Sequence, residues 1–344
     1  MEKRSESYRK EGFVNETPWE EPSLLSYIKI LWEFLFADGE RTPRRPLPRV
    51  QVDLEHLYRR DPARLSVTWV GHSTLLMHLD GYRIMTDPVL QKRISLLGPT
   101  RYNGEAPVDM ARIPELDVVV ISHNHYDHLN RWTIERLHER VRHFVVPLGV
   151  GAHLKTWGVP PEKIVEMDWW EERTIDGLFI ACTPAQHFSG RGLFDRDKTL
   201  WASFVLRGPA HTVFFGGDSG YFPGFKRIGQ AYGPFDMTFL ECGAYDERWH
   251  PIHMFPEETV QAHLDLRGHV LHPIHWGTFN LALHAWYEPM ERLYRAAREK
   301  GVPVTLPVVG ATTIYPNHLH QAAWWRSEEI SPASEAHELQ QPAH

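Results

Sequence analysis

The chain carries the stretch DVVVISHNHYDHL at residues 117–129, and this stretch decides the fold. An apolar run leads directly into the pattern His-x-His-x-Asp-His. Because side chains alternate along an extended chain, His123, His125 and Asp127 fall on one side, and a turn there would bring His128 round to join them. Imidazole and carboxylate ligands at this spacing suit zinc or a similar ion, or a pair of ions. The stretch therefore predicts a metal centre at the end of a buried strand.

One such motif cannot fill two metal sites, so we expect further ligands elsewhere in the chain. The best candidates, His187, Asp218 and His275, each end an apolar run. Positions where a strand meets a loop are the usual place for functional side chains on a rigid scaffold. We therefore expect these three residues to complete the centre.

The order of apolar runs predicts the fold class. Short β-rich runs recur between residues 66 and 309, with helical patterns at 132–141, 257–266 and 289–300. Nearly continuous apolar strands are typical of sheets covered on both faces, and strands mixed with helices predict an α/β layered fold. We expect an N-terminal extension at 1–60, one large domain at 61–325 and a disordered tail at 326–344.

The extension holds an apolar helix predicted at 24–36. At about 1.5 Å per residue, this helix is too short to cross a membrane. We favour a helix buried against the protein over one that lies at a membrane interface. Residues 41–60 contain six arginines against two acidic residues, and here we favour a solvated linker over a patch that meets anionic lipid headgroups.

Composition narrows the class of function and the compartment. The 37 basic and 44 acidic residues give a net charge of −7, which argues against a nucleic-acid partner. The two cysteines, Cys182 and Cys242, exclude a disulfide scaffold and suit a reducing compartment. Neither a membrane-spanning run nor a signal peptide is visible, so we expect a cytoplasmic protein, with peripheral membrane contact left open.

The metal motif and its distant partners resemble the metallo-β-lactamase fold over residues 60–310. A closer resemblance is to the phospholipase D family that hydrolyses N-acylphosphatidylethanolamine, and it extends over nearly the whole chain. The matching stretches are WVGHST at 69–74, TDPV at 86–89, SHNHYDHL at 122–129, TPAQH at 183–187, GDSGY at 217–221, GAY at 243–245, PEE at 256–258 and HWGTF at 275–279. The early GFVN at 12–15 and PW at 18–19 also resemble that family.

The resemblance implies an α/β fold of the αββα four-layer type with two zinc ions. By matching positions, His123, His125 and His187 would hold one ion, and Asp127, His128 and His275 the other. Asp218 would bridge the ions together with a hydroxide that attacks the substrate. Iron or manganese are alternatives, because imidazole and carboxylate ligands also accept them.

Five further residues are interpreted around this centre. His253 matches a histidine close to the site in the resembling family, so it is a candidate to bind the phosphate or protonate the leaving group, and with Asp127 and Asp218 it makes up the predicted catalytic set. Tyr221, Tyr245 and Trp276 adjoin the ligands and are predicted to line the substrate pocket. Asp87 is a candidate to orient a metal-bound histidine.

His72 lies in a turn between strands, and we interpret it as structural.

The function implied is hydrolysis of N-acylphosphatidylethanolamine to N-acylethanolamine and phosphatidate. The expected partner is a phospholipid, and a homodimer stays open. The main alternative is a metal-dependent hydrolase of a soluble substrate, such as a sugar-phosphate lactone or a nucleotide phosphodiester. A nuclease is disfavoured by the acidic charge, because binding a phosphate backbone needs compensating cations.

Overall fold

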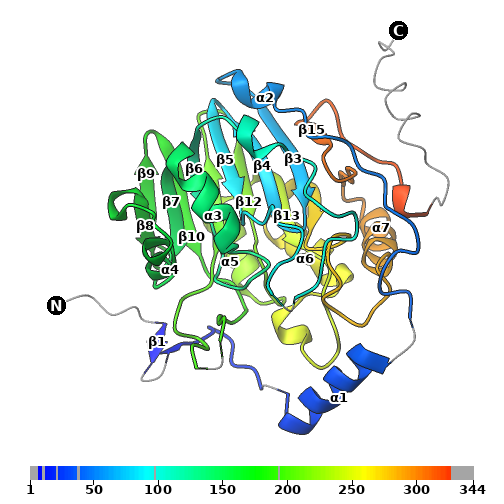
Figure 1. Cartoon of the computed structure of the whole chain (residues 1–344). Coiled ribbons are helices and arrows are strands. Elements are labelled where there is room, and N and C mark those ends of the chain that lie inside the picture. Colours follow the sequence, from blue (N-terminus) through cyan, green and yellow to red (C-terminus); the bar gives the residue numbers. More distant parts are fainter. Residues whose placement is uncertain are drawn as a thin grey trace.

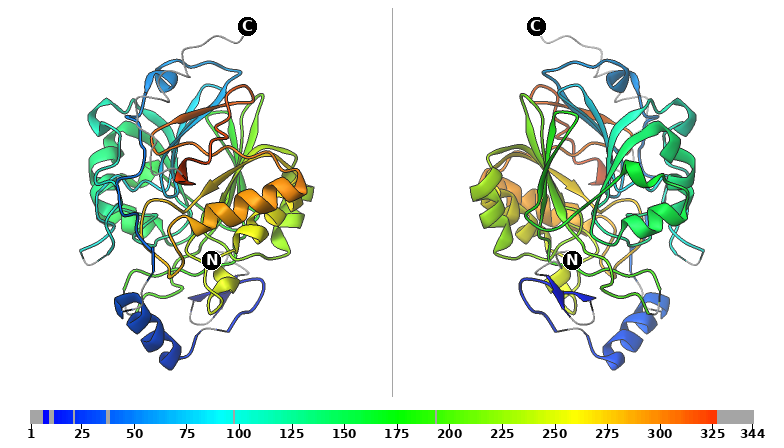
Figure 2. Two further views of the ribbon diagram at one scale, coloured as in Figure 1. Left: turned by 90° about the vertical axis from the view of Figure 1, so that its right-hand side faces the viewer. Right: turned by 90° about the vertical axis from the view of Figure 1, so that its left-hand side faces the viewer.

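The computed structural model describes residues 7–9, 12–20, 22–36, 39–96, 98–192 and 194–326. Two β-sheets lie face to face, and helices cover the outer face of each sheet (Figures 1 and 2). This is the αββα arrangement that the resemblance implies, and it agrees with the α/β layered fold predicted from the sequence patterns. The disordered tail predicted at 326–344 lies outside the described residues, except for Arg326.

The first sheet has the strand order β15-β3-β4-β5-β6-β7-β8. Its strands β3 to β5 pair antiparallel, and β5 to β8 run parallel. The bounds are β3 (Leu65–Gly71), β4 (Thr74–Leu79), β5 (Tyr82–Thr86), β6 (Leu116–Val120), β7 (Val141–Pro147), β8 (Ile164–Met167) and β15 (Thr312–Tyr315).

The second sheet has the order β14-β13-β12-β11-β10-β9. Strands β12, β13 and β14 are parallel, and the others pair antiparallel. The bounds are β9 (Glu172–Ile175), β10 (Leu178–Thr183), β11 (Ser203–Arg207), β12 (Thr212–Phe215), β13 (Phe235–Glu241) and β14 (Gly268–Ile274). A small separate ribbon pairs β1 (Tyr8–Arg9) with β2 (Gly12–Phe13).

Each sheet has its own helical cover (Figure 2). The helices α2 (Glu55–Tyr58), α3 (Arg131–Leu137) and α4 (Gly151–Thr156) lie on the first sheet. The second sheet is covered by α5 (Gly224–Tyr232), α6 (Pro256–Asp265) and α7 (Glu288–Lys300). The predicted helices at 257–266 and 289–300 are confirmed to within one residue at each end, whereas the pattern at 132–141 ends as a 3-10 turn at His138–Arg140.

Alternation along the strands explains why they are apolar on both faces. In β4, Leu75 and Met77 belong to a core that also holds Phe204 of the second sheet. The intervening Leu76 packs in a separate core with Ile134 of α3 and Leu154 of α4. Successive side chains of a strand point to opposite faces, so a strand between two layers must be apolar at every position.

The parallel strands bring the functional loops to one edge of the sandwich. Asp87 follows β5, and His123 follows β6 by a few residues. In the second sheet, Asp218 follows β12, and His275 comes directly after β14. Because carboxyl ends of neighbouring parallel strands meet at one edge, side chains far apart in the sequence converge there.

Helix α1 (Leu24–Phe36) begins and ends where the sequence predicts, but it is not buried. It lies at one end of the sandwich, apart from both helical layers (Figures 1 and 2). Leu25, Leu31 and Leu35 are 78%, 61% and 64% exposed. The expectation of a helix buried against the protein is therefore wrong for most of its apolar side chains. Among the described residues, no helix combines the length and the apolar character needed to cross a bilayer.

The arginines of the 41–60 segment are largely engaged with the protein. Arg41 donates to the Phe34 carbonyl at the end of α1, and Arg49 donates to the carbonyl of Asn103. Arg60 pairs with the buried carboxylate of Asp117 at 3.0 Å. The segment is thus a linker whose arginine side chains bind it to the protein surface, and it is not freely solvated.

Candidate metal centre

The loop after β6 folds as the motif predicts. The backbone N–H groups of His128 and Leu129 both donate to the carbonyl of His125, at 3.1 and 2.8 Å. This tight turn carries His128 back toward His123 and places both rings in contact, with centroids 4.2 Å apart. Four candidate ligands therefore come from one short loop.

One group of histidines, His123, His125 and His187, offers converging ring nitrogens. Nδ1 of His125 lies 2.8 Å from Nε2 of His123 and 3.3 Å from Nε2 of His187. Burial holds the pKa of His123 and His187 well below the usual value and lowers that of His125 to about 4. The rings are therefore neutral at neutral pH, and lone pairs are free to bind a cation.

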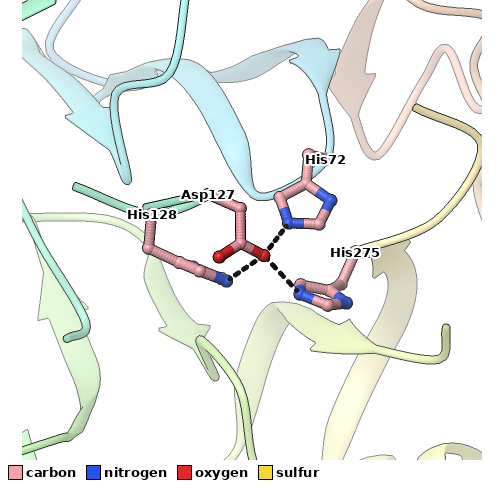
Figure 3. Close-up of side chains that lie close together, drawn as sticks. All are labelled: His72, Asp127, His128 and His275. Atoms are coloured by element: carbon pink, nitrogen blue, oxygen red, sulfur yellow. Dashed lines mark hydrogen bonds and ion pairs between the residues drawn. The ribbon is translucent and has the colours of Figure 1, made fainter. Parts of the chain in front are cut away.

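A second group converges on Asp127, as Figure 3 shows. Its Oδ2 atom lies 2.9 Å from Nε2 of His72 and 3.4 Å from Nε2 of both His128 and His275. The presence of His72 was not expected. It does sit in the turn between β3 and β4, but interpreting it as purely structural missed its contact with a candidate ligand.

Asp218 lies between the two groups. Its Oδ2 atom is 3.0 Å from Nε2 of His275 and 3.1 Å from Nε2 of His128. The same oxygen is 3.9 Å from Nε2 of His123 and 3.8 Å from Nε2 of His187. This contact with both groups agrees with the bridging position that the resemblance implies.

Protons on histidine rings balance the negative charges of the carboxylates in the centre, and bound metal ions can take the place of these protons. Burial lowers the pKa of His275, but the negative charges of Asp218 and Asp127 outweigh burial and raise it to about 10. Burial raises the pKa of Asp218, but the charges and hydrogen bonds of His128 and His275 outweigh burial and hold it well below its usual range. The buried Oδ1 of Asp218 has no hydrogen-bonding partner among the described residues. Such a donor set, buried and mutually facing, fits a pair of divalent cations.

Asp87 orients one of these ligands, as the sequence suggests. Its carboxylate Oδ2 lies 2.6 Å from Nδ1 of His128 and accepts from the Ser122 hydroxyl at 2.6 Å. Its Oδ1 accepts the Ser122 N–H at 2.7 Å. With Nδ1 of His128 donating to Asp87, Nε2 is the ring nitrogen left to bind a cation at the centre in place of a proton.

The three predicted pocket residues Tyr221, Tyr245 and Trp276 lie elsewhere. The Tyr221 and Tyr245 hydroxyls donate to carboxylates, on Asp265 and Glu288 respectively. Trp276 is buried and stacks on Trp69 and Trp324, with ring centroids 5.4 and 5.1 Å apart. None of the three lines the cleft at the centre, although Trp276 lines a smaller hollow together with His275, and their substrate-binding role stays a prediction.

The cleft instead lies between the centre and α1. Its empty volume is about 840 Å³, which includes the part that is open to solvent. His125, Asp127, Asp218, His253 and His275 form its floor. The walls are mainly apolar and include Tyr27, Ile30 and Phe34 of α1, with Phe188, Trp249 and Leu281 from the body of the protein. His253 therefore lines the cleft beside the candidate ligands, and its role toward a substrate stays a prediction.

Sequence reasoning missed one further acidic residue beside the centre, Glu241. It is fully buried at the end of β13, and its Oε2 lies 2.7 Å from Nδ1 of His253. The signal that identified Asp218, a polar residue at the end of an apolar run, also exists for Glu241 in the run 237–241. Glu241 was overlooked because no metal-ligand pattern points to it.

Comparison with known proteins identifies the family. The model of the beta-lactamase superfamily domain matches residues 82–276. The chain belongs to this superfamily. It is 45% identical over 338 residues to an uncharacterized protein of Mycobacterium tuberculosis, covering 95% of this chain and 89% of that protein.

Other relatives carry a named activity. The N-acyl-phosphatidylethanolamine-hydrolyzing phospholipase D 1 of Caenorhabditis elegans is 37% identical over 246 residues, covering 67% of this chain and 68% of that protein. The mitochondrial enzyme of the same name from Saccharomyces cerevisiae is 33% identical, covering 68% of this chain and 52% of that protein. The resemblance stated from the motifs is therefore confirmed.

A solved structure confirms the fold. Igni18, a metallo hydrolase of the archaeon Ignicoccus hospitalis, superposes with a TM-score of 0.57 at 24% identity, covering 74% of this chain and 99% of that one. Fold, family and candidate ligand set agree, and the protein is a metal-dependent hydrolase of the metallo-β-lactamase family.

Proposed function

We propose that the protein is a zinc-dependent phosphodiesterase that hydrolyses N-acylphosphatidylethanolamine to N-acylethanolamine and phosphatidate. The observation that carries the proposal is the cleft, whose apolar walls end on a floor of histidines and carboxylates. A phospholipid matches this cleft, because its acyl chains suit the apolar walls and its charged phosphodiester suits the polar floor. The relatives from Caenorhabditis elegans and Saccharomyces cerevisiae support the same substrate class.

Seven residues would hold the metal ions. His123, His125 and His187 form one set, Asp127, His128 and His275 the other, and Asp218 touches both. Two bound ions would lower the pKa of water toward neutrality and stabilise charge on the phosphate oxygens. Nitrogen and oxygen ligands of this kind favour zinc, and they also accept iron or manganese.

His253 is the chain's own candidate for proton transfer. Its ring lies beside the ligand rings, with centroids 4.9 Å from His187 and 5.5 Å from His275. A side chain on the cleft floor is within reach of the phosphodiester, so it can donate a hydrogen bond to phosphate or a proton to the departing oxygen.

Helix α1 supplies a route from a lipid surface to this floor. Tyr27, Ile30 and Phe34 lie three or four residues apart and face the cleft. On the outer side of the helix, Leu25, Ile28, Leu31 and Leu35 remain exposed. A contiguous apolar face of this kind is typical of a helix that lies in a membrane interface. We therefore include peripheral contact with a bilayer in the proposal, with α1 as the contacting element.

The test combines metal content with lipid turnover. The full-length protein is loaded with zinc and assayed on N-acylphosphatidylethanolamine in mixed micelles, alongside Asp218→Ala and the control Asp61→Ala, which alters an exposed carboxylate remote from the centre. We expect about two zinc ions per chain and release of N-acylethanolamine, with both lost or strongly reduced only in Asp218→Ala. Two ions without lipid turnover would reject the substrate and favour a soluble ester, lactone or nucleotide. Full metal binding in Asp218→Ala would reject the proposed ligand set.

A further inference from the structure

Glu241 is a buried carboxylate that the metal ligands do not account for. It ends β13, has no exposed surface, and lies among the candidate ligands: suitable atoms of Asp218, Glu241, His253 and His275 all fall within 4.8 Å of one another. Burying a carboxylate is costly unless donors surround it. The hydrogen-bond partners of Glu241 therefore indicate the reason for its burial.

The carboxylate of Glu241 has two backbone N–H donors and one histidine ring nitrogen within hydrogen-bond distance. Oε1 accepts the backbone N–H groups of Ser219 and Met254, each at 3.1 Å. Oε2 lies 2.7 Å from Nδ1 of His253. Two fixed N–H donors on one oxygen hold the carboxylate plane, and the other oxygen lies within hydrogen-bond distance of Nδ1 of His253, whereas Nδ1 of His275 is farther away at 3.9 Å.

His253 needs such an anchor because its own backbone does not fix its ring. The residue follows the short 3-10 turn His250–Ile252, outside any helix or strand. Rotation of an imidazole about χ2 is broad and roughly two-fold, so the two ring nitrogens can exchange places. The hydrogen bond to Glu241 removes this ambiguity, since it fixes Nδ1 on the side of β13 and leaves Nε2 for the cleft that His253 lines.

We propose that Glu241 is a positioning residue that holds His253 with its Nδ1–H toward β13 and its Nε2 toward the substrate. The proposal rests on the phosphodiesterase function proposed above. Glu241 touches neither substrate nor reacting atoms and acts through His253. The two residues form a buried carboxylate–histidine pair beside the candidate metal ligands. In this arrangement, Nε2 of His253 is the atom that gives a proton to the departing oxygen.

The proton balance of the step follows. An oxygen from water forms a bond to phosphorus, and the bond between phosphorus and the ethanolamine oxygen breaks. That oxygen takes a proton from Nε2 of His253 and leaves as the alcohol of N-acylethanolamine. One proton of the water stays with the phosphate, and the other restores His253, so no external acid is consumed.

Glu241→Gln tests the proposal with little change of shape. The amide carbonyl can accept the N–H groups of Ser219 and Met254, which turns the amide NH₂ toward Nδ1 of His253. Nδ1 must then accept, and the ring keeps its single proton on Nε2 as a neutral imidazole, a far weaker proton donor than an imidazolium. The matched control is Glu166→Gln, because Glu166 also accepts a backbone N–H, at 3.0 Å from Gly151, but lies on β8 away from the centre.

The first readout does not depend on activity. Nitrogen-15 spectra of zinc-loaded, histidine-labelled protein report which ring nitrogens carry protons, and His253→Ala identifies the His253 signals. We expect a protonated Nδ1 in the native protein and a changed protonation pattern in Glu241→Gln only. An unprotonated Nδ1 in the native protein, or an identical His253 pattern in Glu241→Gln, overturns the proposal whether or not the lipid is a substrate.

The second readout compares leaving groups. Departure of an alkoxide needs a proton, whereas 4-nitrophenolate leaves without one, so we compare N-acylphosphatidylethanolamine with a 4-nitrophenyl phosphodiester. We expect Glu241→Gln to lower kcat on the lipid about 10- to 100-fold and to change kcat on the aryl ester little. The double variant with His253→Ala should lose no more activity than His253→Ala alone. Equal losses on both substrates, or additive losses in the double variant, overturn it. Native protein inactive on both substrates refutes the phosphodiesterase function instead, and the spectra still decide the role of Glu241.

Discussion

Replacing Asp87 with asparagine tests how the protein prepares a metal ligand. The Asp87 carboxylate is fully buried and receives the Ser122 N–H, the Ser122 hydroxyl and Nδ1 of His128 at 2.6 to 2.7 Å. Asparagine has the same shape but presents an NH₂ group in place of one oxygen. If the carbonyl takes the Ser122 N–H, the NH₂ faces Nδ1 of His128 and must donate to it. The ring proton then moves to Nε2, the nitrogen aimed at Asp218.

The size of the effect follows from this one exchanged hydrogen bond. A hydrogen bond to a charged group contributes about 1.5–3 kcal/mol, and about 1.4 kcal/mol corresponds to a factor of ten in affinity. The change to Asp87→Asn should therefore weaken zinc binding about 10- to 100-fold, the range typical of residues that orient metal-bound histidines. The lipid cleft should be unaltered, because Asp87 does not line it.

The assay is a competition titration of zinc against a chelator of known affinity, with circular dichroism to verify folding. The matched control is Asp117→Asn, since Asp117 is also buried and hydrogen-bonded but sits near the opposite end of β6. We expect the control to lose stability without losing zinc affinity. Unchanged zinc affinity in folded Asp87→Asn, or an equal loss in Asp117→Asn, would show that the contact with His128 does not prepare the ligand.

Two further predictions concern the lipid surface and pH. Full burial of a leucine stabilises by about 1.5–3 kcal/mol, so two leucines contribute about 3–6 kcal/mol. Leu31→Ala combined with Leu35→Ala should therefore weaken binding to phospholipid vesicles about 100-fold or more in a sedimentation assay. An equal loss in Leu96→Ala, an exposed leucine outside α1, would argue against α1 as the contact. His263 is buried against Thr238 with a pKa lowered by burial to about 4. The unfolded chain, with a pKa near 6.5, binds the extra proton first, so stability falls as pH drops below about 6.5, by about 2 kcal/mol at about pH 5. Denaturant unfolding of His263→Asn should lose that part of the pH dependence, and an unchanged slope would refute the assignment.

The sequence predicted the layered fold because its local patterns have local causes. Strands covered on both faces must be apolar at consecutive positions, as Leu75, Leu76 and Met77 are. The His-x-His-x-Asp-His turn closes through hydrogen bonds between residues close in the chain, so the residues of the loop itself determine its shape. His187, Asp218 and His275 were also accessible, because polar residues at strand ends stand out against apolar runs.

Tertiary structure decided what depends on pairing between distant segments. His72 reaches Asp127 only because the turn between β3 and β4 lies beside the loop after β6. Glu241 and His253 meet because β13 ends beneath the turn that precedes His253. No spacing rule relates such pairs, since the distance between them is set by how the sheets stack.

The same division explains why three predicted pocket residues do not line the cleft. Tyr221, Tyr245 and Trp276 adjoin ligands along the chain, yet neighbours in a turn point in different directions, and Trp276 enters the aromatic stack while His275 enters the centre. The apolar composition of α1 fixed its bounds but not its surroundings, because the same sequence suits a protein core or a lipid surface. The sequence by itself thus determined the elements and most of the ligands through local patterns, and only the packing of distant segments decided which side chains share the cleft.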